Sequence, residues 1–242
     1  MKILLKLSLT AISASLLVAC GANSNLATSF TQQAAISYRV TLTNTTAAQP
    51  FSPVAIVLHD GSWSTFNLGE PASTELEMLA ESGDNSALLA AAENMAGVFN
   101  AASGTGDIGP GESESIEVEV TESQTAILSL SLVSMLVNTN DAIAALNRID
   151  ISALNPNESM RVNALSYDTG TEANTETAAT MPGPAAAGGA PEGFNAVRDD
   201  VRDSVFVHAG VVTTTDGLTT SALSSIHRWD HPAIQIRVER LN

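Results

Sequence analysis

The stretch Tyr167-Asp168-Thr169-Gly170-Thr171-Glu172-Ala173-Asn174 follows a short apolar run, residues 160–165, that is typical of a β-strand. It places two carboxylates, Asp168 and Glu172, on either side of a glycine, with two hydroxyls and an amide close by. These are hard oxygen donors, and Ca²⁺ prefers such donors because it takes about six to eight oxygens in flexible geometry. Taken alone, the stretch is more typical of a solvated acidic turn than of a metal site.

Apolar patterning elsewhere in the chain predicts more strands. Residues 38–43, 116–120 and 234–239 alternate between apolar and polar with period two, which is typical of half-buried strands. Residues 54–58 and 126–137 are apolar runs, the second interrupted by serines, and they indicate strands buried on both faces. Several short strands separated by turn signals predict an all-β fold, an antiparallel β-sandwich.

One or two short helices are expected in the connections. Ser73 and Thr74 precede an acidic first turn, so a helix is predicted through residue 81. A second helix is predicted over residues 87–99, which are rich in Ala, Leu, Glu and Met. Residues 103–111 are rich in glycine and predict a loop.

The first residues predict a secreted, lipid-anchored protein. Lys2 and Lys6 precede an apolar and small-residue run, and Cys20 is the only cysteine in the chain. This pattern predicts a signal peptide over residues 1–19. It resembles a bacterial lipobox, so Cys20 is the predicted lipidation site, and Gly21 after it favours the outer membrane. Residues 20–35 would form a flexible tether, and residues 36–242 the folded domain.

The net charge of the chain limits the classes of partner that it is expected to bind. The net charge is −16, and removal of residues 1–19 with Lys2 and Lys6 would make it −18. No lysine and only eight arginines would then remain. Nucleic acid is therefore excluded as a partner, because its binding needs basic residues that neutralise phosphates.

A second group of oxygen donors lies at Asn138-Thr139-Asn140-Asp141, directly after the long apolar run. If this strand and the one before Asp168 end at the same rim, then Asp141, Asp168 and Glu172 converge there. Three like charges close together are unfavourable unless a cation neutralises them. Backbone carbonyls and water would complete the shell of a Ca²⁺ site.

An enzymatic alternative rests on His59-Asp60, with Ser62 and Ser64 nearby. A hydrolase needs a nucleophile, a base and an orienting group that meet in space. The chain has no Gly-x-Ser-x-Gly nucleophile elbow. His59 is therefore interpreted as a turn-capping residue, and the chain is predicted not to be an enzyme.

Several motifs, in their order along residues 36–240, resemble the spondin N-terminal domain family. The most specific is Tyr167-Asp168-Thr169-Gly170-Thr171-Glu172, which is similar to the family's aspartate turn. The others are Phe51-Ser52-Pro53, His59-Asp60-Gly61, Gly69-Glu70-Pro71-Ala72-Ser73, Leu79-Ala80-Glu81-Ser82-Gly83-Asp84, residues 135–141 and residues 229–240. The resemblance implies a jelly-roll-like β-sandwich with one Ca²⁺ at a rim.

Carried over by that resemblance, the metal ligands are Asp141, Asp168 and Glu172. Two departures separate this chain from the animal members, namely Ala142-Ile143 in place of aromatic residues and a lack of cysteines for disulfides. The expected function is a calcium-binding, lipid-anchored surface module of a bacterial outer membrane. Its expected partners are extracellular matrix, glycans or a surface protein. The alternatives are an envelope hydrolase using His59 and Asp60, or a purely structural lipoprotein.

Overall fold

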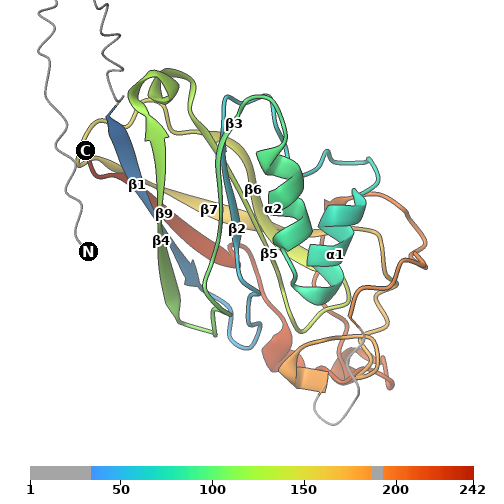
Figure 1. The fold of residues 1–242 in the computed structure, drawn as a ribbon. Coiled ribbons are helices and arrows are strands. Elements are labelled where there is room, and N and C mark those ends of the chain that lie inside the picture. The colour runs from blue at the N-terminus through green and yellow to red at the C-terminus, as the bar shows by residue number, and fades with distance from the viewer. Residues whose placement is uncertain (1–33, 187–192) are drawn as a thin grey trace, which may run out of the picture. The chain divides into compact units, whose positions relative to one another are not determined.

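Nine antiparallel strands form one continuous sheet in the part of the chain that the computed structural model describes, residues 34–186 and 193–242. Their order is β3-β2-β5-β6-β7-β9-β1-β4, with β8 paired to β7 (Figure 1). The strands are β1 (Ala35–Asn44), β2 (Ala55–His59), β3 (Val98–Ser103), β4 (Ser113–Thr121), β5 (Ser129–Met135), β6 (Ala142–Asp150), β7 (Ser159–Asp168), β8 (Phe206–Val207) and β9 (Ile234–Arg240). The predicted all-β class is confirmed.

Strand β7 joins the two halves of the sheet. Residues 159–164 pair with β9, whereas residues 165–168 pair with β6. The β9-β1-β4 half and the β6-β5-β2-β3 half both contribute buried side chains to one large apolar cluster, which includes Tyr38, Leu42, Leu58, Leu130 and Ile236. Burial of this apolar surface is the main stabilising contribution to such a fold.

Strand β5 is buried along its whole length because both of its faces are covered. Leu130 and Leu132 belong to the large cluster, while Val133 and Met135 belong to a second cluster that contains residues of helix α1. Two covered faces explain why this part of the sequence is a continuous apolar run rather than an alternating one.

Two short α-helices, α1 (Thr74–Ser82) and α2 (Ser86–Glu93), lie side by side next to β2 and β5 in Figure 1. The Ser73 hydroxyl caps α1 by accepting the Leu76 N–H at 3.2 Å, and Gly83 ends it in the left-handed conformation with φ of 75°. The predicted start of this helix is confirmed. No helix in the two described ranges is long and apolar enough to cross a membrane.

The predicted helix over residues 87–99 is wrong at its C-terminal end. Helix α2 ends at Glu93, and residues 98–103 form β3, which pairs with β2. Gly97 turns the chain between them with φ of 86°, and a side chain there would overlap the Asp60 carboxylate. The alanines in this stretch favour a helix locally, but pairing along an already buried strand overrides that preference.

The remaining short elements are 3-10 helices: η1 (Glu122–Ile127), η2 (Pro184–Ala186), η3 (Thr214–Asp216) and η4 (Ser225–His227). In the short apolar stretch of residues 205–209, only the two residues of β8 form a strand. This strand pairs with Tyr167 and Asp168, so it brings residues 206–208 against the turn that contains the predicted metal ligands.

Candidate metal centre

Asp141 and Asp168 are neighbours because β6 and β7 are paired. Ala142, the first residue of β6, is in register with Asp168, the last residue of β7. Both aspartates are buried, with 0% of Asp141 and 1% of Asp168 exposed. The predicted meeting of these two residues at one rim is therefore correct, and they lie on adjacent strands rather than on opposite sides of the rim.

The turn after β7 wraps around one oxygen of Asp141. Oδ2 accepts hydrogen bonds from the Thr171 N–H at 2.8 Å, the Thr169 hydroxyl at 2.9 Å and the Glu172 N–H at 3.2 Å. The other oxygen, Oδ1, is buried and has no hydrogen-bond partner among the described residues. One oxygen of this carboxylate is thus well supplied with donors, while the other has none among the described residues.

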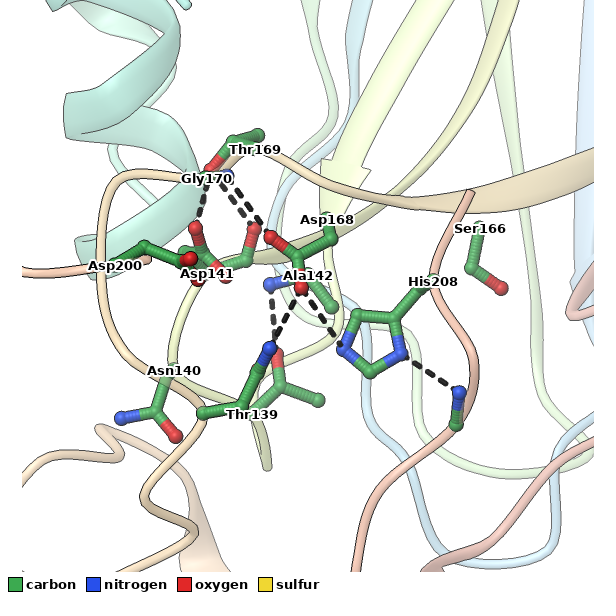
Figure 2. A network of polar contacts seen from close by, with 12 residues as sticks. Thr139, Asn140, Asp141, Ala142, Ser166, Asp168, Thr169, Gly170, Asp200 and His208 are labelled. Carbon is green, nitrogen blue, oxygen red and sulfur yellow. Dashed lines mark hydrogen bonds and ion pairs between the residues drawn. The ribbon is translucent and has the colours of Figure 1, made fainter. Parts of the chain in front are cut away.

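Asp168 is held by the same turn and by the segment after it. Its Oδ1 accepts the Gly170 N–H at 2.9 Å, and its Oδ2 accepts the Asn174 amide at 2.6 Å. His208 lies on the other side, with Nε2 4.0 Å from Asp168 Oδ2 (Figure 2). The Gly210 N–H donates to His208 Nδ1 at 2.9 Å, so the proton of the neutral ring is on Nε2.

A third carboxylate arrives from a distant part of the sequence. Figure 2 shows the side chain of Asp200 pointing toward the region where Asp141 and Asp168 meet. Its charge is one of the causes that raise the pKa of Asp168. A hollow of about 470 Å³ adjoins it, lined by Ala173, Asn174, Asp200, Val201, Arg202 and Phe206. Asp200 therefore lies between the buried aspartates and an open rim.

Glu176 adds a fourth acidic group near the cluster. It is 1% exposed, its Oε1 accepts the Val212 N–H at 3.2 Å, and its Oε2 has no partner among the described residues. Its backbone takes a left-handed conformation with φ of 57°, which costs energy for a residue other than glycine. The Asn140 side-chain oxygen accepts the Glu176 N–H at 3.1 Å and so helps to hold this conformation.

The buried environment of the cluster favours the neutral form of its carboxyl groups. Burial raises the pKa of Asp141 to about 6, with a further contribution from the charge of Asp168. Burial also raises the pKa of Asp168, and it raises the pKa of Glu176 to about 7. Burial lowers the pKa of His208 to about 4, so this ring is neutral at pH 7 and supplies no positive charge.

The described side chains supply no positive charge to these carboxylates. Within residues 34–186 and 193–242, no arginine forms an ion pair with Asp141, Asp168 or Glu176. A buried carboxylate without a counter-charge is destabilised, and either a proton or a cation relieves this. The donors are carboxylate and amide oxygens, which suit Ca²⁺ rather than a softer metal.

The acidic side chains do not form a complete metal cage on their own. In the described ranges, no three His, Cys, Asp or Glu side chains are grouped closely enough to hold a metal ion. A Ca²⁺ ion here would therefore take part of its shell from amide oxygens, backbone carbonyls and water, or would draw Asp200 closer.

The predicted ligands are thus only partly brought together. Asp141 and Asp168 adjoin, and Glu172 is placed beside them by its backbone N–H, which donates to Asp141. Sequence analysis missed Asp200 and Glu176, which lie in stretches without strand or helix patterning, and it missed His208, which lies in the short apolar stretch 205–209. The repeated four-residue spacing of Asp168, Glu172 and Glu176 was an available signal for Glu176. Cys20, the predicted lipidation site, lies outside the described residues.

The geometry around His59 does not support a hydrolase. The Gly61 N–H donates to Nδ1 at 3.0 Å, so Nε2 carries the proton and donates to the Ser131 hydroxyl at 3.0 Å. A general base needs the opposite polarity, with a free nitrogen that accepts from the serine. Both side chains are also buried, with 0% of His59 and 1% of Ser131 exposed. Asp60 points elsewhere and accepts the Ser62 N–H at 2.9 Å.

The fold and the site define an antiparallel all-β domain with a buried acidic cluster at one rim. Comparison with family models places the chain more specifically. The model described as Spondin_N matches residues 40–187, which is more than half of the chain, so the chain belongs to the spondin N-terminal domain family. The match spans Asp141, Asp168 and Glu172 and ends before Asp200. No curated protein matches the chain.

Proposed function

We propose that this chain is a calcium-binding, non-enzymatic module of a bacterial cell surface. The observation that carries the proposal is Asp141, a carboxylate with no exposed surface, one unpartnered oxygen and no ion pair. Burial of such a group is costly unless a cation or proton joins it. Asp168 and Asp200 supply further oxygens on the same side, and the family resemblance adds Glu172.

Bound Ca²⁺ would supply the positive charge that the described side chains do not. The surrounding residues would position the donors: the turn 168–172 fixes Asp141 through three of its donor groups, and Asn174 fixes Asp168. A ligand that binds only the folded state raises stability by mass action. The site is therefore expected to strengthen the rim of the sheet where β6, β7 and β8 meet.

The direct test is thermal unfolding of the full chain in EDTA and in a series of CaCl₂ concentrations. We expect the melting temperature to rise with Ca²⁺, and Asp168→Ala to abolish that rise. MgCl₂ is the matched control, because Mg²⁺ demands a tighter octahedral geometry and keeps its waters. Identical melting of the wild-type chain with and without Ca²⁺ would refute the metal site.

Attachment to the membrane is the second part of the proposal. It rests on the sequence around Cys20, which resembles a bacterial lipobox. Lipid chains stabilise membrane attachment by about 0.8 kcal/mol per buried CH₂ group, so a multiply acylated cysteine anchors firmly. Metabolic labelling with a palmitate analogue should mark the wild-type chain and not Cys20→Ser. Equal labelling of both would argue against a lipid anchor at this residue.

The binding role that we propose is adhesion to matrix, glycan or another surface protein. The 470 Å³ hollow beside Asp200 supports it, because a bound cation would lie next to a space open to a ligand. Arg202 lines the same hollow, is exposed, and forms no ion pair within the described ranges. Binding to arrays of glycans and matrix proteins should require Ca²⁺ and weaken in Arg202→Gln. If EDTA leaves this binding unchanged, adhesion does not depend on the proposed metal site.

A further inference from the structure

Asp200 belongs to residues 195–205, a segment that we call the strap. It runs from helix α1, past the acidic cluster, to β8. We propose that docking of the strap on α1 sets how tightly the acidic cluster holds its cation, with Arg198 as the positioning residue. This inference rests on the proposed calcium site and adds a means of regulating it from outside the cluster.

The first anchor of the strap is a buried ion pair. Arg198 Nη2 donates to the Glu77 carboxylate at 2.7 Å and to the Ala72 carbonyl at 2.7 Å, and Nη1 pairs with Asp203. The side chain of Glu77 is 4% exposed and that of Arg198 is 22% exposed. Charges withdrawn from water in this way depend strongly on each other, so removal of one leaves the other buried and uncompensated.

The second anchor lies one helical turn further along α1. Glu81 Oε2 accepts the Asn195 N–H at 2.8 Å, and Thr171 is near enough to Glu81 to lower the pKa of its carboxyl group. Glu81 is 2% exposed. Because residues four apart share a helix face, Glu77 and Glu81 present two buried carboxylates to the same segment. Helix α1 therefore lies against both the strap and the turn that surrounds Asp141.

The strap also docks directly on that turn. The Asp199 N–H donates to the Thr171 carbonyl at 3.2 Å, and Asp199 Oδ1 accepts the Ala173 N–H at 2.7 Å. Gly170 faces the backbone of residues 202–204 so closely that any side chain there would overlap it. The glycine of the aspartate turn thus permits the close approach of the strap, in addition to adopting a φ of 70°.

Asp200 lies between these attachments, so its position depends on them. Asp199 is fixed to the turn on one side, and on the other side the Arg202 N–H donates to Asp200 Oδ1 at 2.7 Å. Loss of the Arg198–Glu77 pair would leave Glu81 as the remaining anchor on α1, loosen the strap and let the Asp200 carboxylate move away from the cluster. Binding energies at linked sites are reciprocal, so cation binding should in turn hold the strap on α1.

The inference is tested by calorimetric titration of the full chain with CaCl₂. We expect Arg198→Gln to weaken Ca²⁺ binding by about tenfold, within the usual range for coupling between sites. Arg228→Gln is the matched control, because it removes an arginine whose exposed ion pair with Asp216 lies outside the strap. This control should bind Ca²⁺ as the wild-type chain does. Equal affinity of Arg198→Gln and wild type would overturn the inference.

A double variant tests whether Arg198 acts through Asp200. If Arg198 acts by positioning Asp200, then Asp200→Asn and Asp200→Asn/Arg198→Gln should bind Ca²⁺ with equal affinity. Full additivity of the two losses would overturn positioning through Asp200. A structural defect alone would lower the melting temperature in EDTA without this non-additive pattern.

Two further measurements distinguish failure of this inference from failure of the proposed calcium site. If Arg198→Gln does not fold, Glu77→Gln replaces it, since the glutamine oxygen still accepts from Arg198 while the charge is lost; a smaller but measurable loss of affinity is expected. Trypsin cleavage after Arg202 should slow in Ca²⁺ for the wild-type chain and not for Arg198→Gln. If the wild-type chain binds no Ca²⁺, the proposed function and this inference both fail. Wild-type binding with unaltered variants overturns the inference alone.

Discussion

Two buried polar clusters lie on the same half of the sheet, and they differ in how completely their groups are paired. At His59, both ring nitrogens are hydrogen-bonded, to the Gly61 N–H and to the Ser131 hydroxyl. At Asp141, one oxygen takes several donors and the other has none among the described residues. Both side chains are fully buried.

The difference follows from donor and acceptor chemistry. Histidine, serine and backbone groups both donate and accept, so they can satisfy one another inside a protein. Ionised carboxylates only accept, and a cluster of them cannot be satisfied without a proton or a cation. A fully paired buried network therefore fits a structural role, while several buried carboxylates that lack both a counter-charge and full pairing favour a bound cation. Burial alone does not separate the two.

The largest expected effect is on the paired cluster. His59→Ala removes a buried ring and leaves Ser131 and the Gly61 N–H without their partner. We expect a loss of about 3 kcal/mol in the free energy of unfolding, typical of a buried large-to-small change. Urea unfolding measures it, in EDTA and in CaCl₂ alike. A loss that depends on Ca²⁺ would show that His59 belongs functionally to the metal site.

Asp141→Asn should reduce the stability gained from Ca²⁺ rather than the stability in EDTA, which is the opposite of the effect expected for His59→Ala. The amide oxygen can keep the donors of Thr171 and Glu172, while the NH₂ group replaces the unpaired oxygen. In EDTA we expect stability close to that of the wild-type chain. The wild-type gain at a Ca²⁺ concentration of 100 times Kd, about 2.7 kcal/mol, should be absent from the variant. A variant that retains the full calcium gain would remove Asp141 from the ligand set.

The third prediction concerns the pH dependence of stability and Glu81, whose carboxylate accepts the Asn195 N–H of the strap. Burial raises the pKa of Glu81 to about 7, from 4.5 for the free side chain. Its stabilising contribution is therefore complete below pH 4.5 and is lost as pH rises through about 7. Glu81→Gln should gain stability relative to wild type between pH 5 and pH 8, measured in EDTA by urea unfolding. His208 titrates in both proteins, so its effect cancels in the difference. A pH-independent difference would contradict a raised pKa.

The smallest effect is expected from the exposed Arg228–Asp216 pair. The two groups are 2.8 Å apart, with side chains 58% and 32% exposed. Solvent screens such pairs, so Arg228→Gln should leave the unfolding free energy almost unchanged. The same assay applied to Arg198→Gln should give a clearly larger loss. Equal losses would remove the distinction between the buried and the exposed pair.

Local patterns predicted much of the fold. Helix α1 begins after Ser73, as its hydroxyl and acidic first turn indicate, and ends at Gly83. The alternating and continuous apolar runs became β1, β2, β4, β5, β7 and β9. Strand β3 was missed because residues 98–103 carry no strand pattern, and only their pairing with β2 makes them extended.

The site was predicted in part for the same reason. Asp141 and Asp168 adjoin strand patterns, so their meeting was predicted on the condition that the two strands end at one rim, and the pairing of β6 with β7 meets that condition. Asp200 and Glu176 come from irregular segments, and periodicity does not indicate where such segments run. Cys20 and the lipid anchor remain predictions, as does the identity of the cation.

By itself, the sequence determined the all-β class, the acidic balance and the aspartate turn of residues 167–172, because these depend on composition, periodicity and short-range turn chemistry. The tertiary structure decided which side chains share a buried environment. It placed His59 on Ser131, left one oxygen of Asp141 without a partner, and brought Asp200 to the cluster on a strap held by Glu77 and Arg198. Such contacts join residues far apart in the chain, so only the folded arrangement of strands and helices specifies them.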